Sequence, residues 1–291
     1  MPADTSHVKP RKPRDDEIDV WGISHRGKVR PDNQDHFLLA SIHKHLHVLQ
    51  TTLNEQQRLP LADERVAFIA MVADGVGGGT AGEEASATAL EIATQYLNSS
   101  VDCYYRSDAR EEQFFEAVQA AARRAHEAVL ARAEGRTEKG RSMATTLTLW
   151  MGVWPWHYLL QVGDSRYYIF RDGKLAQITR DQTMAQDLVD QGVLPVSAAK
   201  RSQFANVLSS AIGGPTTVPV VTRIPAHWNN IHLLCTDGLT KHVSDEQIAN
   251  RLTHMTSAKQ VCEQLLQDAL DGGGTDNITV IVGRAVARDP A

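Results

Sequence analysis

The order of apolar segments along the chain constrains its fold more than any other sequence feature. Val66–Ala73 is a short continuous apolar run, which is typical of a buried strand. Apolar residues at helical spacing then predict two long helices, over about 82–97 and 111–134. Downstream, shorter apolar segments predict strands at 145–153, 158–162, 167–170, 175–178, 231–235 and 278–282. Because strands mostly follow strands and the long helices come in pairs, the chain favours antiparallel sheets covered by helices over a doubly wound parallel sheet.

Local signals add turns and helix ends to this outline. Asp172-Gly173 lies between two predicted strands and indicates a tight hairpin. A short helix is expected after Asp181 and should end at Gly192, and residues 193–215 look irregular. Two Ser-x-x-Gln pairs indicate N-terminal caps of helices near the C-terminus, and they begin at Ser244 and Ser257.

Composition bounds the class of protein. The 291 residues carry a formal net charge of -5, so the chain does not resemble a general nucleic-acid binder. Three cysteines without zinc-finger spacing fit a reducing compartment, and no apolar run approaches the ~20 residues of a membrane span. We expect a flexible tail over 1–17 and one domain over 18–287, in a cytoplasmic monomer that binds neither membrane nor nucleic acid.

Aspartates at the ends of apolar strands carry the chemical signal. They occur beside glycine or asparagine in Asp74-Gly75, Gly163-Asp164, Asp237-Gly238 and Asp276-Asn277. One such aspartate is usually a turn or cap residue, but four in one domain suggest a shared site, since a carboxylate at a sheet rim needs a partner or a cation. Hard oxygen ligands without a Cys/His set indicate Mg²⁺ or Mn²⁺ rather than zinc.

A fifth aspartate, Asp35, lies close in sequence to Arg30. Arginine suits phosphate because its guanidinium can donate two parallel hydrogen bonds. On its own an arginine five residues before an aspartate means little, and Gly77-Gly78-Gly79 does not form a P-loop motif.

Together these segments resemble the type 2C, metal-dependent protein phosphatases, in their bacterial form. The resemblance runs from about Gly22 to Val282, and its six pieces occur in the order of the family. They are Gly22-Ile23-Ser24 with Arg30…Asn33-Gln34-Asp35, Val72-Ala73-Asp74-Gly75-Val76-Gly77-Gly78, Ala144-Thr145-Thr146, Val162-Gly163-Asp164-Ser165-Arg166, Cys235-Thr236-Asp237-Gly238-Leu239 and Gly274-Thr275-Asp276-Asn277-Ile278-Thr279. The resemblance implies an α+β fold, a four-layer α-β-β-α sandwich with two central, mostly antiparallel sheets. It also implies hydrolysis of phosphoserine and phosphothreonine in phosphoproteins by a metal-activated water, opposing a serine/threonine kinase.

The family pattern also assigns metal ligands. Asp74 matches the carboxylate that bridges two Mn²⁺ or Mg²⁺ ions, and the Gly75 carbonyl matches a further ligand. Asp237 and Asp276 match the ligands that complete the pair, and Asp164 with Asp237 matches a third, weaker site. Two divalent ions ~3.5–4 Å apart lower the pKa of a shared water toward neutrality.

Two further residues complete the implied site. Asp35 matches an aspartate that acts mostly through metal-bound water, and Arg30 matches the phosphate-gripping arginine. The sequence departs from common family patterns at Val76, Gln182 and Ala144. Val76 stands where eukaryotic members carry a histidine, which leaves the general acid for the leaving group open.

Other features allow two interpretations. His43, His45 and His47 alternate and can line one strand face as a metal site, although an exposed hairpin explains them as well. Trp150, Trp154, Trp156 and Tyr158 fit packing on an edge strand or an aromatic binding patch. In the irregular segment 193–215, Lys200, Arg201 and Gln203 fit either a solvated loop or a flap that contacts substrate.

Three functional alternatives remain beside the phosphoprotein phosphatase. A non-catalytic relative would keep the fold without turnover, although the chain retains all five aspartates. A hydrolase of another phosphoester, such as a nucleotide, would use the same metals. A phosphatase within a regulatory switch would be expected to carry a sensor domain.

Overall fold

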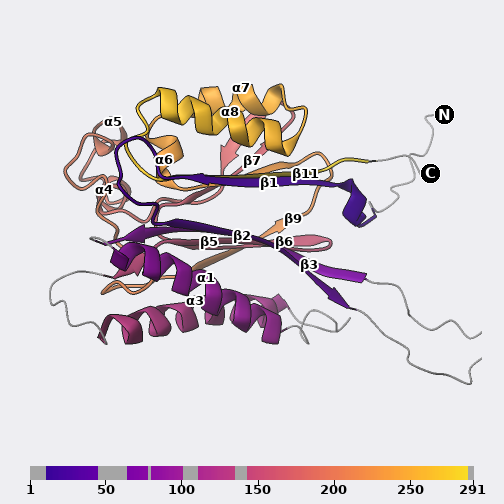
Figure 1. Ribbon diagram of the computed structural model, residues 1–291, viewed down its shortest axis with the longest axis horizontal. Helices are drawn as coiled ribbons and strands as arrows, with labels where there is room; N and C mark the ends of the chain where they lie inside the picture. The colour runs from indigo at the N-terminus through magenta and orange to yellow at the C-terminus, as the bar shows by residue number, and fades with distance from the viewer. Residues whose placement is uncertain (1–10, 45–63, 78–79, 101–110, 135–142, 288–291) are drawn as a thin grey trace, which may run out of the picture.

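Two antiparallel β-sheets lie face to face in the middle of the molecule, and a pair of helices covers the outer face of each sheet (Figure 1). This confirms the predicted α-β-β-α sandwich. The computed structural model describes residues 11–44, 64–77, 80–100, 111–134 and 143–287. Among these residues, no helix is both long and apolar enough to cross a membrane.

The first sheet has five strands in the order β1-β11-β10-β7-β8. Their bounds are β1 (Ile18–His25), β11 (Ile278–Ala285), β10 (Ile231–Cys235), β7 (Arg166–Arg171) and β8 (Lys174–Gln177). β7 and β8 form the predicted hairpin, and its two turn residues have positive φ, 51° at Asp172 and 76° at Gly173. Positive φ at both positions is what an Asp-Gly hairpin turn provides.

The second sheet has the order β2-β3-β5-β6-β9, with the short β4 paired to the end of β3. The strands are β2 (Asp35–Lys44), β3 (Glu64–Val76), β4 (Ala144–Thr145), β5 (Leu147–Val153), β6 (Trp156–Val162) and β9 (Val220–Pro225). β3 is central and buried on both faces, which explains its continuous apolar run: Ile69 and Met71 pack beneath helices, whereas Ala70 and Val72 face the other sheet.

Each sheet buries its outer face beneath two helices. α1 (Thr80–Ser99) and α3 (Glu111–Glu134) cover the second sheet through an alanine-rich interface. α7 (Asp245–Thr253) and α8 (Ala258–Asp271) cover the first sheet. Ser244 and Ser257 cap these last two helices as predicted, because each side chain accepts the backbone N–H three residues later.

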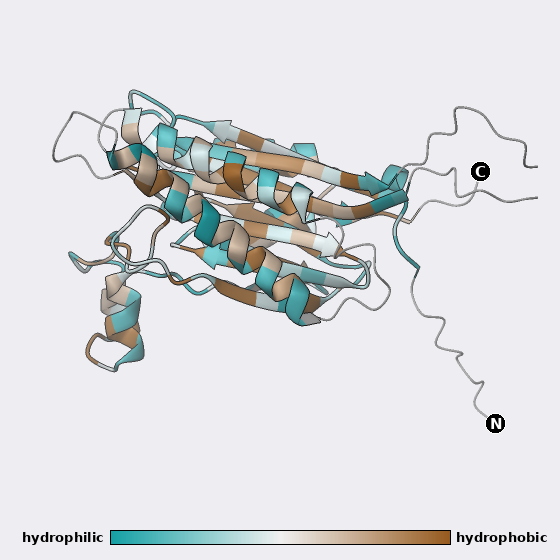
Figure 2. Cartoon of the chain, turned by 90° about the horizontal axis from the view of Figure 1, so that it is seen from below, coloured by the Kyte–Doolittle hydropathy of each residue, from teal (hydrophilic) through white to brown (hydrophobic). Residues whose placement is uncertain are grey.

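Three short helices gather at one end of the sandwich. They are α4 (Met184–Asp190), α5 (Val196–Ala199) and α6 (Asp237–Thr240). α4 matches the helix predicted between Asp181 and Gly192, and α5 lies within the segment predicted to be irregular. Figure 2, viewed from below, shows the segment that carries α4 and α5 projecting from the layers at that end, opposite the two chain termini.

The structure corrects the interpretation of the aromatic residues near 150–158. β5 and β6 are internal strands of their sheet, so these residues do not pack on an edge strand. Nor do they share one patch: Tyr158 stacks on Phe114 beneath α3, at a ring separation of 5.1 Å. Trp150 and Trp154 instead line a pocket between the two sheets.

Residues 11–17 differ from the flexible tail that the sequence predicts. Asp15–Glu17 form a 3-10 turn, and Glu17 is buried against Arg11. Arg65 on β3 pairs with Asp15. The residues before Arg11 lie outside the described part of the chain, as do His45 and His47, so the predicted domain boundary and the predicted histidine site stay predictions.

Candidate active site

Both sheets deliver carboxylates to one end of the sandwich. They come from the first residue of β2, the end of β3, the turn after β6, the start of α6 and the turn before β11. In that order they are Asp35, Asp74, Asp164, Asp237 and Asp276. All five predicted aspartates therefore lie at the ends of strands that converge, beside the short helices (Figure 1).

Asp35 lies beneath the other carboxylates. It pairs directly with Asp74 in the β2–β3 register and is 4% exposed. Its Oδ2 accepts hydrogen bonds from the hydroxyls of Thr236 and Thr279, each at 2.8 Å, whereas its Oδ1 is buried with no hydrogen-bond partner. Burial raises the pKa of Asp35 to about 7, and the two hydroxyls oppose this in part.

The backbone of Asp74 is fixed by two threonines, Thr145 at the end of β4 and Thr146 directly after it. Its N–H donates to Thr146 Oγ1 at 2.9 Å, and its carbonyl accepts from the Thr146 N–H and from the Thr145 hydroxyl. Burial raises the pKa of Asp74 well above its usual value, and the negative charges of Asp35 and Asp237 raise it further. The carboxyl group is thus held where a cation would be favoured.

Gly75 is required by the close approach of α1. A Cβ at this position would lie 2.1 Å from the carbonyl oxygen of Gly82 and 2.8 Å from that of Gln34. Only glycine fits there. This packing holds the end of β3, and with it Asp74, against the first turn of the helix.

Lys241 joins two of the carboxylates. Its Nζ lies 2.6 Å from an oxygen of Asp237 and 2.6 Å from an oxygen of Asp276. The other oxygen of Asp237, Oδ1, is buried without a hydrogen-bond partner. Burial alone would raise the pKa of Asp276, but contacts with Lys241 and Arg30 outweigh it and lower the pKa. Burial raises the pKa of Asp237 despite Lys241.

Arg30 extends over the site from the loop between β1 and β2. The Arg30 Nε lies 2.8 Å from Asp276 Oδ1, and the Arg30 Nη2 donates a hydrogen bond to Asp276 Oδ2 at 3.0 Å. The guanidinium therefore contacts both oxygens of the carboxylate. The Arg30 side chain is 52% exposed. The same fork that holds a carboxylate fits two phosphate oxygens.

Asp164 faces the cluster from the turn after β6. Gly163 precedes it with φ +101°, and a Cβ there would lie 2.6 Å from Thr146 Cγ2. The turn is thereby pressed against the threonines that hold Asp74. Burial, together with the negative charge of Asp237, raises the pKa of Asp164 to about 8.

Two adjoining hollows open above these residues. The smaller hollow has a volume of about 190 Å³, and the residues that line it include Arg30, Asp74, Gly75, Asp164, Asp237 and Asp276. The wider one, of about 650 Å³, shares four of these residues and extends to the segment that carries α4 and α5. Lys200 lines the wider hollow. The segment 193–215 therefore borders the carboxylates, as the flap interpretation expects.

Sequence reasoning missed two residues that organise the site. Lys241 lies four residues after Asp237, at the C-terminal cap of α6. The sequence did not predict this helix, so the i,i+4 spacing of the two residues did not indicate an ion pair. Asn277 was quoted only as a neighbour of Asp276. Its side-chain nitrogen donates to the carbonyls of Arg26 and Asp32, and its Oδ1 accepts from the Gln34 N–H at 2.8 Å.

The donor set suits a hard divalent cation. Two buried carboxylate oxygens, Asp35 Oδ1 and Asp237 Oδ1, lack partners, and repulsion among carboxyl groups contributes to the raised pKa values at Asp35, Asp74, Asp164 and Asp237. Within the described residues, however, no three acidic, histidine or cysteine side chains converge closely enough to ligate one ion by themselves. A bound ion would therefore also draw ligands from backbone carbonyls and water.

Comparison with known proteins places this arrangement in a family. A family model described as protein phosphatase 2C matches residues 61–272. The chain belongs to the protein phosphatase 2C family. The matched residues span β3 to the end of α8 and include Asp74, Asp164 and Asp237, whereas Asp35 and Asp276 lie just outside them.

Curated relatives from the protein phosphatase 2C family carry serine/threonine phosphatase names. Serine/threonine protein phosphatase PstP of Mycobacterium tuberculosis is 34% identical over 223 residues, which cover 77% of this chain and 41% of PstP. The matched part of the chain thus spans less than half the length of that relative. Serine/threonine phosphatase stp of Listeria welshimeri is 28% identical over 223 residues, covering 74% of this chain and 83% of the relative.

Solved structures of the same family share the fold. The crystal structure of the Mycobacterium tuberculosis phosphatase PstP/Ppp matches with a TM-score of 0.73 and 30% identity, over 93% of this chain and 99% of that one. A structure of the PstP catalytic domain in complex with two manganese ions matches with a TM-score of 0.70, also at 30% identity and the same coverage.

Proposed function

We propose that this chain is a metal-dependent phosphatase that hydrolyses phosphoserine and phosphothreonine in phosphoproteins. One observation carries the proposal: four carboxylates line an open hollow beside a half-exposed arginine fork, above the buried Asp35, and two buried oxygens of this cluster lack hydrogen-bond partners. Membership of the protein phosphatase 2C family and the serine/threonine phosphatase names of relatives support the substrate class. A cognate serine/threonine kinase and a monomeric, cytoplasmic state stay predictions.

The metal centre that we propose follows the positions of the ligands. Asp74, the Gly75 carbonyl, Asp237 and Asp276 would hold a pair of divalent ions, and Asp35 would act through water from beneath. Asp164 and Asp237 would hold a third ion. The two manganese ions in the PstP structure support Mn²⁺, and Mg²⁺ has the same preference for oxygen. Bound ions would supply an activated water and offset charge on the phosphoryl group.

The chain's own cations must then change partners. In the described structure Lys241 and Arg30 together neutralise Asp276, and Lys241 also contacts Asp237. Divalent ions at these carboxylates would compete with the ammonium and the guanidinium for the same oxygens. Released from Asp276, Arg30 keeps an exposed guanidinium at the rim of the hollow, where it can grip the substrate phosphate.

The wide hollow favours a protein substrate. This hollow has a volume of about 650 Å³ and lies between the carboxylates and the segment with α4 and α5. Lys200 lines it and can contact residues that flank a phosphorylated side chain. We therefore propose that residues 193–215 contribute to substrate choice.

A non-catalytic binding module is the second candidate, and the ion pairs favour it. Lys241 already satisfies one oxygen of Asp237 and one of Asp276, as in a cluster that holds itself together without metal. The remaining unpartnered oxygens of Asp35 and Asp237 weigh against this reading.

Phosphate release separates the candidates. We would supply a phosphothreonine peptide and a nucleotide in parallel, each with Mn²⁺, with Mg²⁺ and with a chelator. The proposal expects release that needs metal and a kcat/KM at least about tenfold higher for the peptide, since protein contacts add transition-state binding. Faster release from the nucleotide would indicate another phosphoesterase, and no release from folded protein would indicate the binding module.

A further inference from the structure

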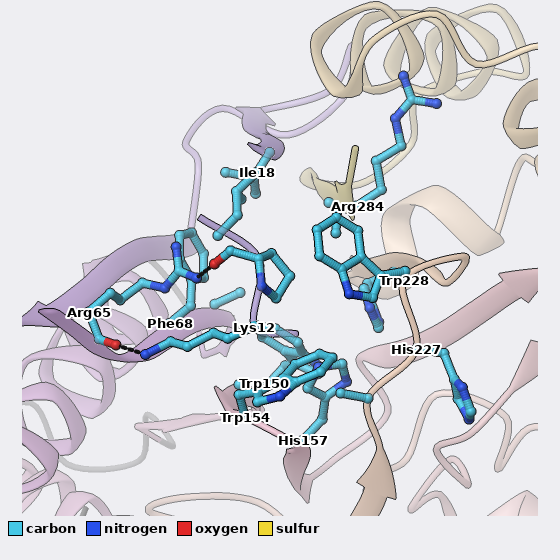
Figure 3. A pocket seen from close by; sticks show the side chains of 18 of the residues that line it. Lys12, Ile18, Arg65, Phe68, Trp150, Trp154, His157, His227, Trp228 and Arg284 are labelled. Atoms are coloured by element: carbon cyan, nitrogen blue, oxygen red, sulfur yellow. Dashed lines mark hydrogen bonds between the residues drawn. The ribbon is translucent and has the colours of Figure 1, made fainter. Parts of the chain in front are cut away.

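A second pocket opens between the two sheets at the end of the sandwich away from the carboxylates (Figure 3). It has a volume of about 110 Å³. β3 contributes Phe68 to this pocket and Asp74 to the active site, six residues further along. At ~3.3 Å per residue, Phe68 and Asp74 are about 20 Å apart along the strand.

The N-terminal segment forms one side of this inter-sheet pocket. Lys12 donates to the carbonyl of Arg65, and the Arg65 guanidinium donates to the carbonyl of Pro13 at 2.6 Å. Trp228 Nε1 donates to the carbonyl of Arg11 at 2.8 Å, and the Arg11 guanidinium lies over the Trp228 ring. These contacts hold the segment in place as part of the wall.

The pocket interior is aromatic. The rings of Phe68 and Trp150 pack edge to face at 6.4 Å, and Trp154 and Trp228 line the same space from two loops. Most of the exposed surface inside the pocket is apolar. Flat apolar walls of this kind favour a ring over a flexible chain.

One polar group inside the pocket lacks a partner. His157 is 8% exposed, and its Nδ1 is buried with no hydrogen bond. Burial lowers the pKa of His157 well below its usual value, so the ring is neutral and carries one donor and one acceptor nitrogen. A buried polar atom without a partner costs free energy, which a ligand or an ordered water would recover.

The neighbouring polar groups do not supply that partner. His232 Nδ1 is hydrogen bonded to the Tyr167 hydroxyl at 2.6 Å. Trp150 Nε1 is also buried without a hydrogen bond. Burial raises the pKa of Tyr167, and an interaction with the Trp150 indole opposes part of that rise. His157 Nδ1 and Trp150 Nε1 therefore both lack a hydrogen bond in this pocket, and His157 is the one of the two whose ring can also accept a hydrogen bond.

The charges at the rim are already compensated. Arg65 pairs with Asp15, and Arg284 pairs with Asp19 at 3.1 Å. Lys12 lies 3.9 Å from Glu64. With neutral imidazoles inside and paired cations outside, the pocket offers no excess charge for an ion, so a neutral occupant fits best.

We propose that this inter-sheet pocket binds a small neutral phenol-type molecule, its ring between Phe68, Trp150 and Trp228 and its hydroxyl hydrogen bonded to His157. The volume sets the upper size: about 110 Å³ is less than the ~150 Å³ of an apolar cavity that holds benzene, so the pocket has room for no more than one ring, part of which would extend into its opening. A hydroxyl matches a neutral imidazole since it can donate to or accept from Nδ1. The inference uses no part of the phosphatase chemistry and stands apart from it.

Tryptophan fluorescence provides the test. Three of the five tryptophans, Trp150, Trp154 and Trp228, line the pocket, so filling it should change the emission. We would titrate the full chain with phenol and with toluene, exciting where neither probe absorbs. The wild type should show a saturable change with both probes.

Two variants separate the hydrogen bond from the apolar contact. His157→Phe keeps a ring but removes the partner of the hydroxyl, so the Kd for phenol should rise about five- to tenfold while that for toluene stays unchanged. His254→Phe is the matched control, because His254 is exposed at the end of α7 and does not line the pocket, and it should change neither Kd.

Several results would overturn the proposal. They are the absence of a saturable change with either probe, an equal effect of His157→Phe on phenol and toluene, and an effect of His254→Phe as large as that of His157→Phe. A crystal of the wild-type protein soaked in phenol gives an independent answer if His157→Phe fails to fold. Density for a ring between Phe68 and Trp150 supports the proposal, and ordered water alone at His157 Nδ1 contradicts it.

Discussion

At the scale of single residues, the site is a balance between carboxylates that repel one another and the groups that hold them there. Asp35 and Asp74 are opposite each other on adjacent strands, where like charges destabilise a sheet. Hydroxyls from Thr236 and Thr279 and the ammonium of Lys241 reduce that cost without removing it. The pKa values of Asp35 and Asp164 are raised first by burial and then by the repulsion that remains.

Lys241 should compete with metal for two carboxylates. Lys241→Met removes a cation that lies 2.6 Å from both Asp237 and Asp276. We expect the Mn²⁺ concentration for half-saturation in calorimetry to fall several-fold, while the metal-free protein melts at a lower temperature. Lys259→Met is the matched control, because Lys259 is exposed and its ammonium lies 3.9 Å from Glu263 and over the Trp21 ring, without contact to a site carboxylate. Weaker Mn²⁺ binding in Lys241→Met would show that Lys241 supports the metals instead.

His232 should make stability depend on pH. Burial lowers the pKa of His232 from 6.5 to about 4. Between these values the unfolded chain binds more protons than the folded one, so stability is full above about pH 6.5 and falls as the pH drops toward 4. The loss should approach about 3 kcal/mol. Urea unfolding at several pH values measures it.

The comparison variant for this pH dependence is His232→Gln, and His254→Gln on the exposed end of α7 is its control. The fall in unfolding free energy between pH 6.5 and pH 4.5 should shrink in His232→Gln and stay the same in His254→Gln. An unchanged pH slope in His232→Gln would assign the acid sensitivity to other groups.

At the scale of elements, the loop between β1 and β2 depends on one asparagine. This loop carries Arg30, and Asn277 holds it through hydrogen bonds with Arg26, Asp32 and Gln34. Asn277 lies next to Asp276 in sequence. One turn therefore positions a predicted metal ligand together with the arginine that is proposed to bind phosphate.

Asn277→Ala should uncouple the loop from the site. Three hydrogen bonds are lost and their backbone partners are left partly buried, so we expect about 2–3 kcal/mol of lost stability and a higher KM for a phosphopeptide. Asn250→Ala on the exposed face of α7 removes the same amide and should leave both quantities unchanged. Wild-type KM in a folded Asn277→Ala protein would show that the loop holds Arg30 without it.

Elements were largely predictable because their signals are local. Helical spacing predicted a helix over about 111–134, which matches α3, and Asp172-Gly173 predicted the hairpin of β7 and β8. Contacts between distant segments were not predictable in this way. The pairing of Lys241 with Asp276 and the ordering of residues 11–17 against Arg65 depend on how the sheets close, which no single segment records.

At the scale of the whole molecule, the two facing sheets create two ends with different chemistry. One end gathers the carboxylates because β3, β10 and β11 all end or begin there, and the sequence revealed it since each aspartate is next to an apolar strand. The other end forms the aromatic pocket from residues of both sheets and the N-terminal segment. The sequence showed Trp150 and Trp154 within an aromatic cluster and left an edge strand and a binding patch open, because strand order is a property of the assembled sheet.

The most direct test of the account is phosphate release from a phosphothreonine peptide at saturating Mn²⁺, compared between wild type, Asp74→Asn and Asp172→Asn. Asp74 would bridge the metals, whereas Asp172 lies in the exposed hairpin turn. We expect Asp74→Asn to lose several kcal/mol of transition-state stabilisation, on the order of a thousandfold in rate, and Asp172→Asn to match wild type. Metal-dependent release that survives Asp74→Asn in folded protein would contradict the carboxylate site proposed here.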